Sequence, residues 1–543
     1  MSATLQPARS ARRRWLPWAA LGLLLLVVAG IRLRLLDFPL ERDEGEYAYA
    51  GQLMLQGIPP YALAYNMKWP GTYAAYAAIM GVFGETIGGI HFGLLLVTLA
   101  TAVLVFRLAR RICGDTGAVV AAGTYALLAI TGASLGIAAH ATHFVILPAL
   151  AGVFLLQDYG PDTRLRRIFT AGLLIGCGLL AKQAGAAFGL FAALWVAWRE
   201  WKGGALQWSR LAARLGILAA GGLLPFLFTC AILASAGVFD RFWYWTIEYA
   251  AAYASILGPV IGMQLLAATM ADLFGDAPGL WLLAALGAVL LWFAPALRGW
   301  RAFVTGFVLF SFLAVCPGWY FRGHYFLLFF PAVGLLAGIA VQTVAEWLPR
   351  VGLRVAPALV AATLFGLSAA HVLWAGRAVF FQLTPAQANR ALYGANPFPE
   401  SIEIAKYLDR HCLSGSKIAV IGSEPQIYFY SRRHSATGYL YTYPLMEPQP
   451  FAAKMQEEMI REIETANPRY VVFVSIATSW LQRQDSHRRI FDWFAQYQRQ
   501  LRLVGLTEIL SMEETSQRWD IDGAAVSPRT NAWVAVFENP TGK

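Results

Sequence analysis

Long apolar runs alternate with short polar segments over the first two thirds of the chain. Each run carries few charges and approaches the ~20 residues that a helix needs to cross a bilayer. Hydropathy predicts about eleven spans, near residues 15–31, 88–106, 116–138, 141–157, 168–182, 184–198, 212–236, 278–297, 302–320, 325–345 and 355–376. The pattern therefore predicts a polytopic α-helical membrane protein.

The composition supports this class. Hydrophobic residues make up 58% of the chain and charged residues only 14%, whereas soluble domains carry roughly 25% charged residues. The net charge is +11, but no basic stripe with interleaved aromatic residues occurs, so nucleic acid is excluded as a partner. The five cysteines have no metal-type spacing, which argues against a disulfide framework or a zinc site built from cysteines.

Basic clusters orient the predicted spans. They fall on one side, which the positive-inside rule makes cytoplasmic: Arg12–Arg14; Arg107, Arg110 and Arg111; Arg164, Arg166 and Arg167; Arg199, Lys202, Arg210 and Arg214; Arg298 and Arg301; and Arg350 and Arg354. Arg32 and Arg34 are exceptions. We expect a multi-pass inner or plasma membrane protein with a cytoplasmic N-terminus and an uncleaved signal anchor as its first span.

Three segments then lie on the outer side: a first loop at 32–87, a loop at 237–277, and everything after about residue 380. The last segment is more polar, and its patterns alternate between helices (401–412, 452–464, 486–500) and strands (417–422, 469–475, 533–539). This alternation predicts an extracytoplasmic α/β domain over residues 381–543, attached to a membrane domain over residues 1–380. Gly422 stands alone without a GxGxxG pattern, so no nucleotide site is predicted.

The first outer loop concentrates acidic residues. Asp43, Glu44 and Glu46 follow a membrane span directly, where carboxylates are costly unless they are solvated, paired or bound to metal. One of them is a candidate for accepting a proton from an attacking hydroxyl. The next residues have helical spacing up to Gly57, which predicts a helix along the membrane surface. A solvated acidic loop that only caps this helix is the alternative.

A family resemblance rests on this loop. Its carrying residues are Asp43-Glu44 after the first span, Tyr47, Gly57, Pro60-Tyr61, and Lys68 with Pro70. With this pattern, residues 32–345 resemble the GT-C glycosyltransferases, which include protein O-mannosyltransferases, the aminoarabinose transferase of lipid A and RgtA/B/C/D-like galacturonosyltransferases.

The resemblance implies a reaction. A polyprenyl-phosphate-linked sugar is the donor on the outer face, and an acceptor hydroxyl attacks the anomeric carbon with inversion. Asp43 is then the catalytic carboxylate, and Glu44 is a second candidate that orients Asp43 or binds a ligand. The acceptor is an envelope glycan, a lipid such as lipid A, or a protein; the sugar stays open.

The leaving phosphate needs positive charge near the outer face. The candidates are Lys68, Lys182, Arg322 and His324, together with Tyr61 of the motif. A buried cation there is expensive without an anionic partner, and Arg and Lys both bind phosphate, Arg in a bidentate fork. The alternatives are snorkelling of Lys182 to the interface and ordinary loop capping by Arg322 and His324.

Metal dependence stays open. In the aminoarabinose-transferase branch a metal-binding Glu precedes the Lys of the Lys-Pro motif, but Met67 stands there in this chain. His140 and His143, three residues apart, can share a helix face and bind metal or substrate, or have no ligand role. No cofactor is certain, and the candidates for a divalent metal are His140, His143 and Glu44.

Other outer residues are less defined. The 237–277 loop offers Asp240, Glu248, Asp272 and Asp276, which we do not rank. Tyr439, Tyr441 and Tyr443 are candidates for stacking on sugar rings or for a place in the domain core.

Three other functions compete with glycosyl transfer. A transporter or flippase of lipid-linked sugars would place charges at the bilayer midplane, whereas the polar candidates here gather at the outer face. A non-catalytic envelope scaffold would not need Asp43. An O-antigen-ligase-like enzyme would rely on Arg and His rather than an early Asp-Glu pair.

Overall fold

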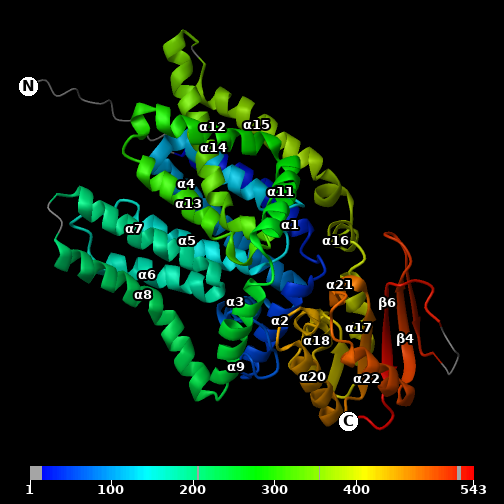
Figure 1. The fold of residues 1–543 in the computed structure, drawn as a ribbon. Coiled ribbons are helices and arrows are strands. Elements are labelled where there is room, and N and C mark those ends of the chain that lie inside the picture. Colours follow the sequence, from blue (N-terminus) through cyan, green and yellow to red (C-terminus); the bar gives the residue numbers. More distant parts are fainter. Residues whose placement is uncertain (1–14, 205–206, 354, 522–526) are drawn as a thin grey trace, which may run out of the picture.

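The computed structural model describes residues 15–204, 207–353, 355–521 and 527–543. A large helical part carries a smaller domain with a β-sheet at one end, beside helix α2 (Figure 1). The protein is therefore a multi-pass membrane protein with a C-terminal α/β domain, as the hydropathy pattern predicts. The expected boundary at residue 381 falls within the short helix η8 (Ala378–Gln382) and stays a prediction.

The apolar helices differ in length. Among the described residues, five are long and apolar enough to span a membrane: α1 (Leu16–Arg34), α4 (Ile87–Leu128), α8 (Trp208–Ser235), α14 (Phe330–Trp347, continued by a short helical turn) and α15 (Pro357–Ala375). Shorter helices in the same part are α5 (Ala141–Leu156), α6 (Leu165–Ala181), α7 (Ala186–Lys202), α12 (Pro278–Phe293) and α13 (Arg301–Leu313). The predicted number of about eleven spans is thus not confirmed.

Several predicted boundaries shift. The spans expected at 88–106 and 116–138 are two arms of α4, joined where Cys113 and Gly114 leave helical geometry, and the second arm ends at Leu128. The expected outer loop 237–277 is largely helical: residues Phe239–Ala254 and α11 (Pro259–Asp276) form a pair bent by 89°. The apolar composition of this bent pair permits a broken span or a re-entrant loop. The sequence prediction assumed straight spans and therefore assigned the segment to a loop.

Small residues let the membrane helices approach closely. On α14, a Cβ atom at Gly334 would lie 2.4 Å from the Ala121 carbonyl oxygen of α4, and one at Gly338 would lie 2.3 Å from the Gly117 oxygen. Such contacts replace the hydrophobic effect, which does not drive helices together inside lipid.

Arg32 and Arg34, the exceptions to the charge pattern, have structural partners. The buried Arg32 guanidinium donates to the Ala129 and Gly136 carbonyl oxygens at 3.0 and 2.8 Å. Arg34 donates to the Val379 oxygen at 3.2 Å. Both side chains therefore satisfy carbonyl groups at the ends of other segments, which accounts for their departure from the pattern.

The segment predicted to be the first outer loop, residues 32–87, holds two helices. The predicted surface helix is α2 (Arg42–Leu55), and its first turn is fixed by a capping box between Glu41 and Glu44. Gly57 follows with a φ of 79°, a left-handed conformation that glycine adopts without strain. The chain then turns back into α3 (Pro70–Phe83).

The C-terminal domain contains one six-stranded sheet in the order β2-β1-β3-β6-β4-β5. The strands are β1 (Lys417–Ile421), β2 (His434–Ser435), β3 (Tyr470–Ser475), β4 (Arg502–Ile509), β5 (Thr515–Trp519) and β6 (Trp533–Glu538). The main helices are α16 (Pro385–Tyr393), α17 (Phe398–His411), α18 (Gln426–Ser431), α20 (Ala452–Ala466) and α22 (Arg489–Tyr497). The strands β1, β3 and β6 and the helices α17, α20 and α22 match the prediction. The polar edge strand β5 and its partner β4 were not predicted.

The first outer loop packs tightly against this domain. The backbone N–H of Tyr65 donates to the Gly438 oxygen at 2.7 Å, and the Leu40 N–H donates to the Tyr430 hydroxyl at 2.9 Å. A Cβ atom on Gly45 would lie 2.5 Å from the backbone nitrogen of Gln426. α2 therefore lies directly against the first turn of α18.

Candidate active site

Asp43 lies in the first turn of α2 and both of its carboxylate oxygens accept hydrogen bonds. Lys68 Nζ lies 3.2 Å from Oδ2, and the Tyr441 hydroxyl donates to Oδ1 at 2.9 Å. The Lys68 ammonium also donates to the Tyr47 hydroxyl at 3.1 Å. One donor comes from the first outer loop and the other from the C-terminal domain, so the carboxylate is held from two sides.

Asp43 is ionised in this setting. Burial opposes ionisation, but the positive charge of Lys68, the nearby His140 imidazole, the positive charge of Arg322 and the hydrogen bond from Tyr441 together hold the pKa of the Asp43 carboxyl well below its usual range. Burial lowers the pKa of His140 itself to about 4, so Lys68 and Arg322 supply the charge at neutral pH. The site is therefore a carboxylate surrounded by cationic and hydrogen-donating side chains.

Tyr61 fixes the backbone beside Lys68. Its hydroxyl donates to the Lys68 carbonyl oxygen at 2.7 Å, and its ring is buried against Phe242 with centroids 5.4 Å apart. Tyr61 therefore positions the Lys68 segment in this structure, and its hydroxyl is already engaged there.

Glu44 points away from Asp43. Its Oε1 lies 2.9 Å from His91 Nε2 and accepts the Ala139 N–H at 2.6 Å. The fully buried side chain thus ties α2 to the segment between α4 and α5. In this arrangement Glu44 holds the residue before His140 in place and does not reach Asp43.

His140 pairs with His324 and not with His143. The His140 and His324 rings stack with centroids 4.0 Å apart. His140 precedes α5, whereas His143 lies within that helix and its Nε2 faces the Gly136 carbonyl oxygen at 3.1 Å. His143 is not among the described residues whose ligand atoms lie close to those of His140, so the structure does not bring the candidate His140–His143 pair together as a metal site.

Asp43, His140 and His324 can hold a metal ion. One ligand atom from each lies within 4.8 Å of the others. Both ring nitrogens of His140 and Nδ1 of His324 are buried without a hydrogen-bond partner in the described part of the chain. One carboxylate and two imidazoles with free nitrogens suit a divalent transition metal. Neither Glu44 nor His143 belongs to this group.

A cavity of about 310 Å³ opens beside Lys68. Lys182, at the turn after α6, lines it together with Lys68, and its Nζ lies 3.6 Å from the ring centroid of Tyr325. Most of the remaining wall is apolar, and part of it comes from the bent segment around residues 246–254. The cavity therefore brings the amino groups of Lys68 and Lys182 next to an apolar wall, along which a lipid chain can lie.

Arg322 lies next to this region. Its guanidinium carbon is 5.6 Å from the Tyr320 ring centroid, and Tyr320 stacks on Tyr253 of the cavity wall with centroids 4.6 Å apart. Arg322 is exposed, and its charge contributes to the low pKa of Asp43.

The remaining sequence candidates have other places. Asp276 Oδ2 accepts the Ala133 N–H at 2.8 Å. Tyr439 donates to Glu458 at 2.8 Å and Tyr443 to the Thr478 oxygen at 2.7 Å. Only Tyr441 of the three tyrosines contacts Asp43, and the tyrosine-rich run was the sole sequence signal for it.

The chain is similar to proteins of known family and structure. Residues 68–228 match the family model described as dolichyl-phosphate-mannose-protein mannosyltransferase. The structure of ArnT from Cupriavidus metallidurans bound to undecaprenyl phosphate is similar over 96% of this chain and 98% of that chain, with a TM-score of 0.60 and 16% identity. No curated protein matches the chain.

Two other solved structures share the fold. The archaeal oligosaccharyltransferase AglB from Archaeoglobus fulgidus is similar over 95% of this chain and 76% of its own, with a TM-score of 0.53 and 12% identity. The arabinofuranosyltransferase AftD from Mycobacteria is similar over 99% of this chain and 40% of its own, with a TM-score of 0.53 and 12% identity. The chain therefore has the GT-C glycosyltransferase fold. The matched segment 68–228 contains Lys68 and Lys182.

Glu46 provides a pH-dependent test of this site. The buried carboxyl accepts hydrogen bonds from Tyr73 and from Asn66. Burial, with the Asp43 charge, raises the pKa of Glu46 to about 8 despite the opposing charge of Lys68. An unfolded Glu has a pKa near ~4.3. The folded protein therefore binds more protons between these two values, and its stability falls as pH rises through this window.

We expect the Glu46→Gln variant to lack this dependence. The stability of the wild type relative to the variant should fall between pH 5 and 8, by up to about 1.4 kcal/mol per pH unit. Melting temperatures in detergent across this range measure the difference. A difference that stays constant with pH would contradict a protonated Glu46.

Proposed function

We propose that the protein is an inverting glycosyltransferase that moves a sugar from a polyprenyl-phosphate donor to a hydroxyl of an envelope glycan, lipid or protein. The observation that carries the proposal is the Asp43 carboxylate beside a cavity that holds Lys68 and Lys182. ArnT, which has a similar fold, binds undecaprenyl phosphate. The basic clusters support an outer-face reaction, with a cytoplasmic N-terminus and an extracytoplasmic C-terminal domain.

The charge balance favours an anionic ligand. Lys68, Lys182 and Arg322 lie near the ionised carboxylate of Asp43, whereas the raised pKa of Glu46 keeps that group largely protonated at neutral pH. Burial and the neighbouring charges of Lys68 and Arg322 lower the pKa of Lys182 well below its usual range, as expected for a cation that lacks an anionic partner. Uncompensated cations near a membrane are costly. A phosphate group supplies the missing negative charge, and the apolar wall suits its polyprenyl chain.

The residues have separate roles in the proposed reaction. The acceptor oxygen forms a bond to the anomeric carbon while the bond from that carbon to the phosphate oxygen breaks. Asp43 takes up the proton of the attacking acceptor hydroxyl, and the electron pair of the broken bond leaves with the phosphate oxygen. Lys68 and Lys182 stabilise the negative charge that develops on the leaving group. Attack from the face opposite the phosphate inverts the configuration at the anomeric carbon.

We also propose that this site can hold a divalent metal ion. Asp43, His140 and His324 would hold it, and the buried imidazole nitrogens that lack a hydrogen-bond partner among the described residues support this assignment. When bound, the ion would supply additional positive charge beside the leaving phosphate.

The Asp43→Asn variant tests the proposed base. The Asp43→Asn variant removes the base at nearly constant volume and should lower transfer by about 10²- to 10⁴-fold. Membranes containing wild type or variant are incubated with a panel of polyprenyl-phosphate sugars and envelope lipids, and polyprenyl phosphate release is followed by mass spectrometry. The exposed Asp37 of the same loop supplies the control Asp37→Asn. Equal release by wild type and Asp43→Asn would remove Asp43 from the reaction.

The Lys182→Ala variant tests the proposed phosphate site. Loss of one charge-assisted contact in Lys182→Ala should weaken polyprenyl phosphate binding by about 10-fold. Lys202→Ala, at the other end of α7, is the control because its ammonium faces the exposed Trp201. Binding to purified protein is measured by native mass spectrometry. Unchanged affinity in Lys182→Ala would exclude Lys182 from the phosphate site.

Metal retention tests the proposed site of Asp43, His140 and His324. If the ion binds, wild type should retain about one equivalent of zinc or manganese after dialysis and melt at a higher temperature in its presence. His140→Ala and His324→Ala should lose both effects, whereas the exposed His371→Ala should keep them. Metal analysis and melting curves report binding without an activity assay. Equal retention in all four proteins would overturn the assignment.

A further inference from the structure

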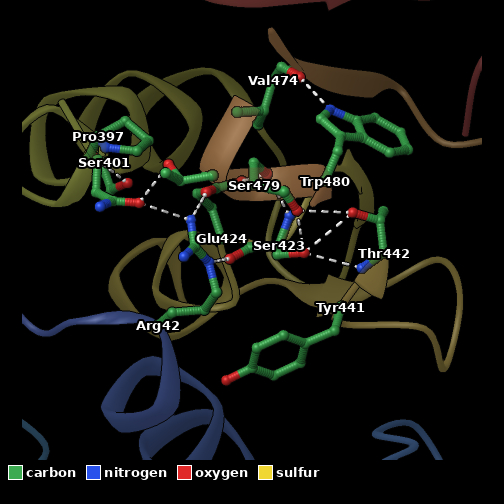
Figure 2. Close-up of polar contacts among 12 residues, drawn as sticks. Arg42, Pro397, Ser401, Ser423, Glu424, Tyr441, Thr442, Val474, Ser479 and Trp480 are labelled. Carbon is green, nitrogen blue, oxygen red and sulfur yellow. Dashed lines mark hydrogen bonds and ion pairs between the residues drawn. The ribbon is translucent and has the colours of Figure 1, made fainter. Parts of the chain in front are cut away.

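The C-terminal domain reaches Asp43 through one side chain. Tyr441 lies between β2 and the short helix α19 (Tyr443–Met446), and only 6% of it is exposed. Its hydroxyl points toward α2 (Figure 2) and donates to Asp43 Oδ1 at 2.9 Å. The donor is thus separated from its acceptor by almost 400 residues of sequence, and the contact exists only while the domain is docked.

A buried ion pair holds α2 to the same domain. Arg42, the residue before Asp43, lies 2.7 Å from Glu424 Oε1 and donates through Nε to the Ser423 carbonyl oxygen at 2.5 Å (Figure 2). The second oxygen of Glu424 accepts the Ser479 hydroxyl at 2.7 Å. Glu424 is fully buried, so it depends on these two partners for its compensation.

Tyr441 and Arg42 are fixed to the same turn. The Thr442 N–H donates to the Ser423 hydroxyl at 2.9 Å, and that hydroxyl donates to the Ser479 oxygen at 2.6 Å. The turn after β1 therefore binds the residue before Asp43 on one side and the residue after Tyr441 on the other. This connection sets the position of the tyrosine hydroxyl relative to the carboxylate.

We propose that Tyr441 is a positioning residue for the Asp43 carboxylate and that the Arg42–Glu424 ion pair makes this positioning depend on the docked C-terminal domain. The catalytic part of this inference rests on the proposed function. Lys68 holds Oδ2 and Tyr441 holds Oδ1, so the two donors together restrict rotation of the carboxylate. A carboxylate orientation fixed before the acceptor arrives favours proton transfer.

The neighbouring tyrosine supplies the matched control. The Tyr439 hydroxyl donates to Glu458 within the C-terminal domain and does not contact Asp43. Tyr441→Phe should lower kcat by about 10-fold or more while donor KM and polyprenyl phosphate affinity change less than about twofold. Tyr439→Phe should retain wild-type kcat. A wild-type kcat in Tyr441→Phe would overturn the positioning role.

A double-variant comparison tests the connection through the ion pair. Glu424→Gln should lower kcat on its own, and adding Tyr441→Phe to it should have a much smaller effect than in the wild type. If the fold-losses of kcat in the two single variants multiply fully in the double variant, the ion pair does not act through Tyr441. Asp43→Asn is assayed in parallel, because wild-type release equal to that of Asp43→Asn would indicate failure of the proposed function instead.

Hydrogen exchange tests the docking without any activity. Glu424→Gln should accelerate amide exchange in residues 42–46 and 439–443, because α2 and the tyrosine segment lose their common anchor. The exposed pair between Glu403 and Lys406 provides the control variant Glu403→Gln, which should leave exchange there unchanged. Unchanged exchange in Glu424→Gln would overturn the docking half of the inference even if every donor tested is inert.

Discussion

The structure depends on a single carboxylate that is held between two parts of the protein. Asp43 accepts hydrogen bonds from Lys68 of the first outer loop and from Tyr441 of the C-terminal domain. The cations that keep Asp43 ionised are also the groups available to a phosphate. A bound phosphate would share their charge and return basicity to Asp43. Donor binding and proton acceptance are therefore linked through the same side chains in this account.

The surrounding polar network is built to hold that geometry. Glu44 anchors the segment before His140, Tyr61 anchors Lys68, and Arg42 anchors the first turn of α2 to the C-terminal domain. Each uses a buried, fully engaged polar group, and such groups are costly to disturb. The two residues of the Asp43-Glu44 motif therefore have different surroundings: Asp43 contacts Lys68, which lines the cavity, and Glu44 contacts His91 and the backbone of Ala139 in the protein interior.

Local patterns predicted a substantial part of this arrangement. Apolar runs identified most membrane helices, and helical spacing with Gly57 gave the extent of α2. Two residues of the motif also meet in the structure, because Lys68 Nζ lies 3.2 Å from Asp43 Oδ2. Contacts between distant segments were beyond local patterns. Tyr441 lies in a connection and His324 in a short 3-10 helix, and the placement of both depends on tertiary packing. The partner of His140 is therefore His324, which is distant in sequence, and not the nearby His143. The kink at Gly114 and the bent pair over residues 239–276 deviate from straight spans, so the predicted number of spans was unreliable.

The most direct test of the central claim is an experimental structure of the wild-type protein with polyprenyl phosphate. We predict that the phosphate lies within hydrogen-bonding distance of Lys68 and Lys182, beside Asp43, with the lipid chain along the apolar wall that includes residues 246–254. A phosphate bound elsewhere, with the Lys182 ammonium still over the Tyr325 ring, would contradict it.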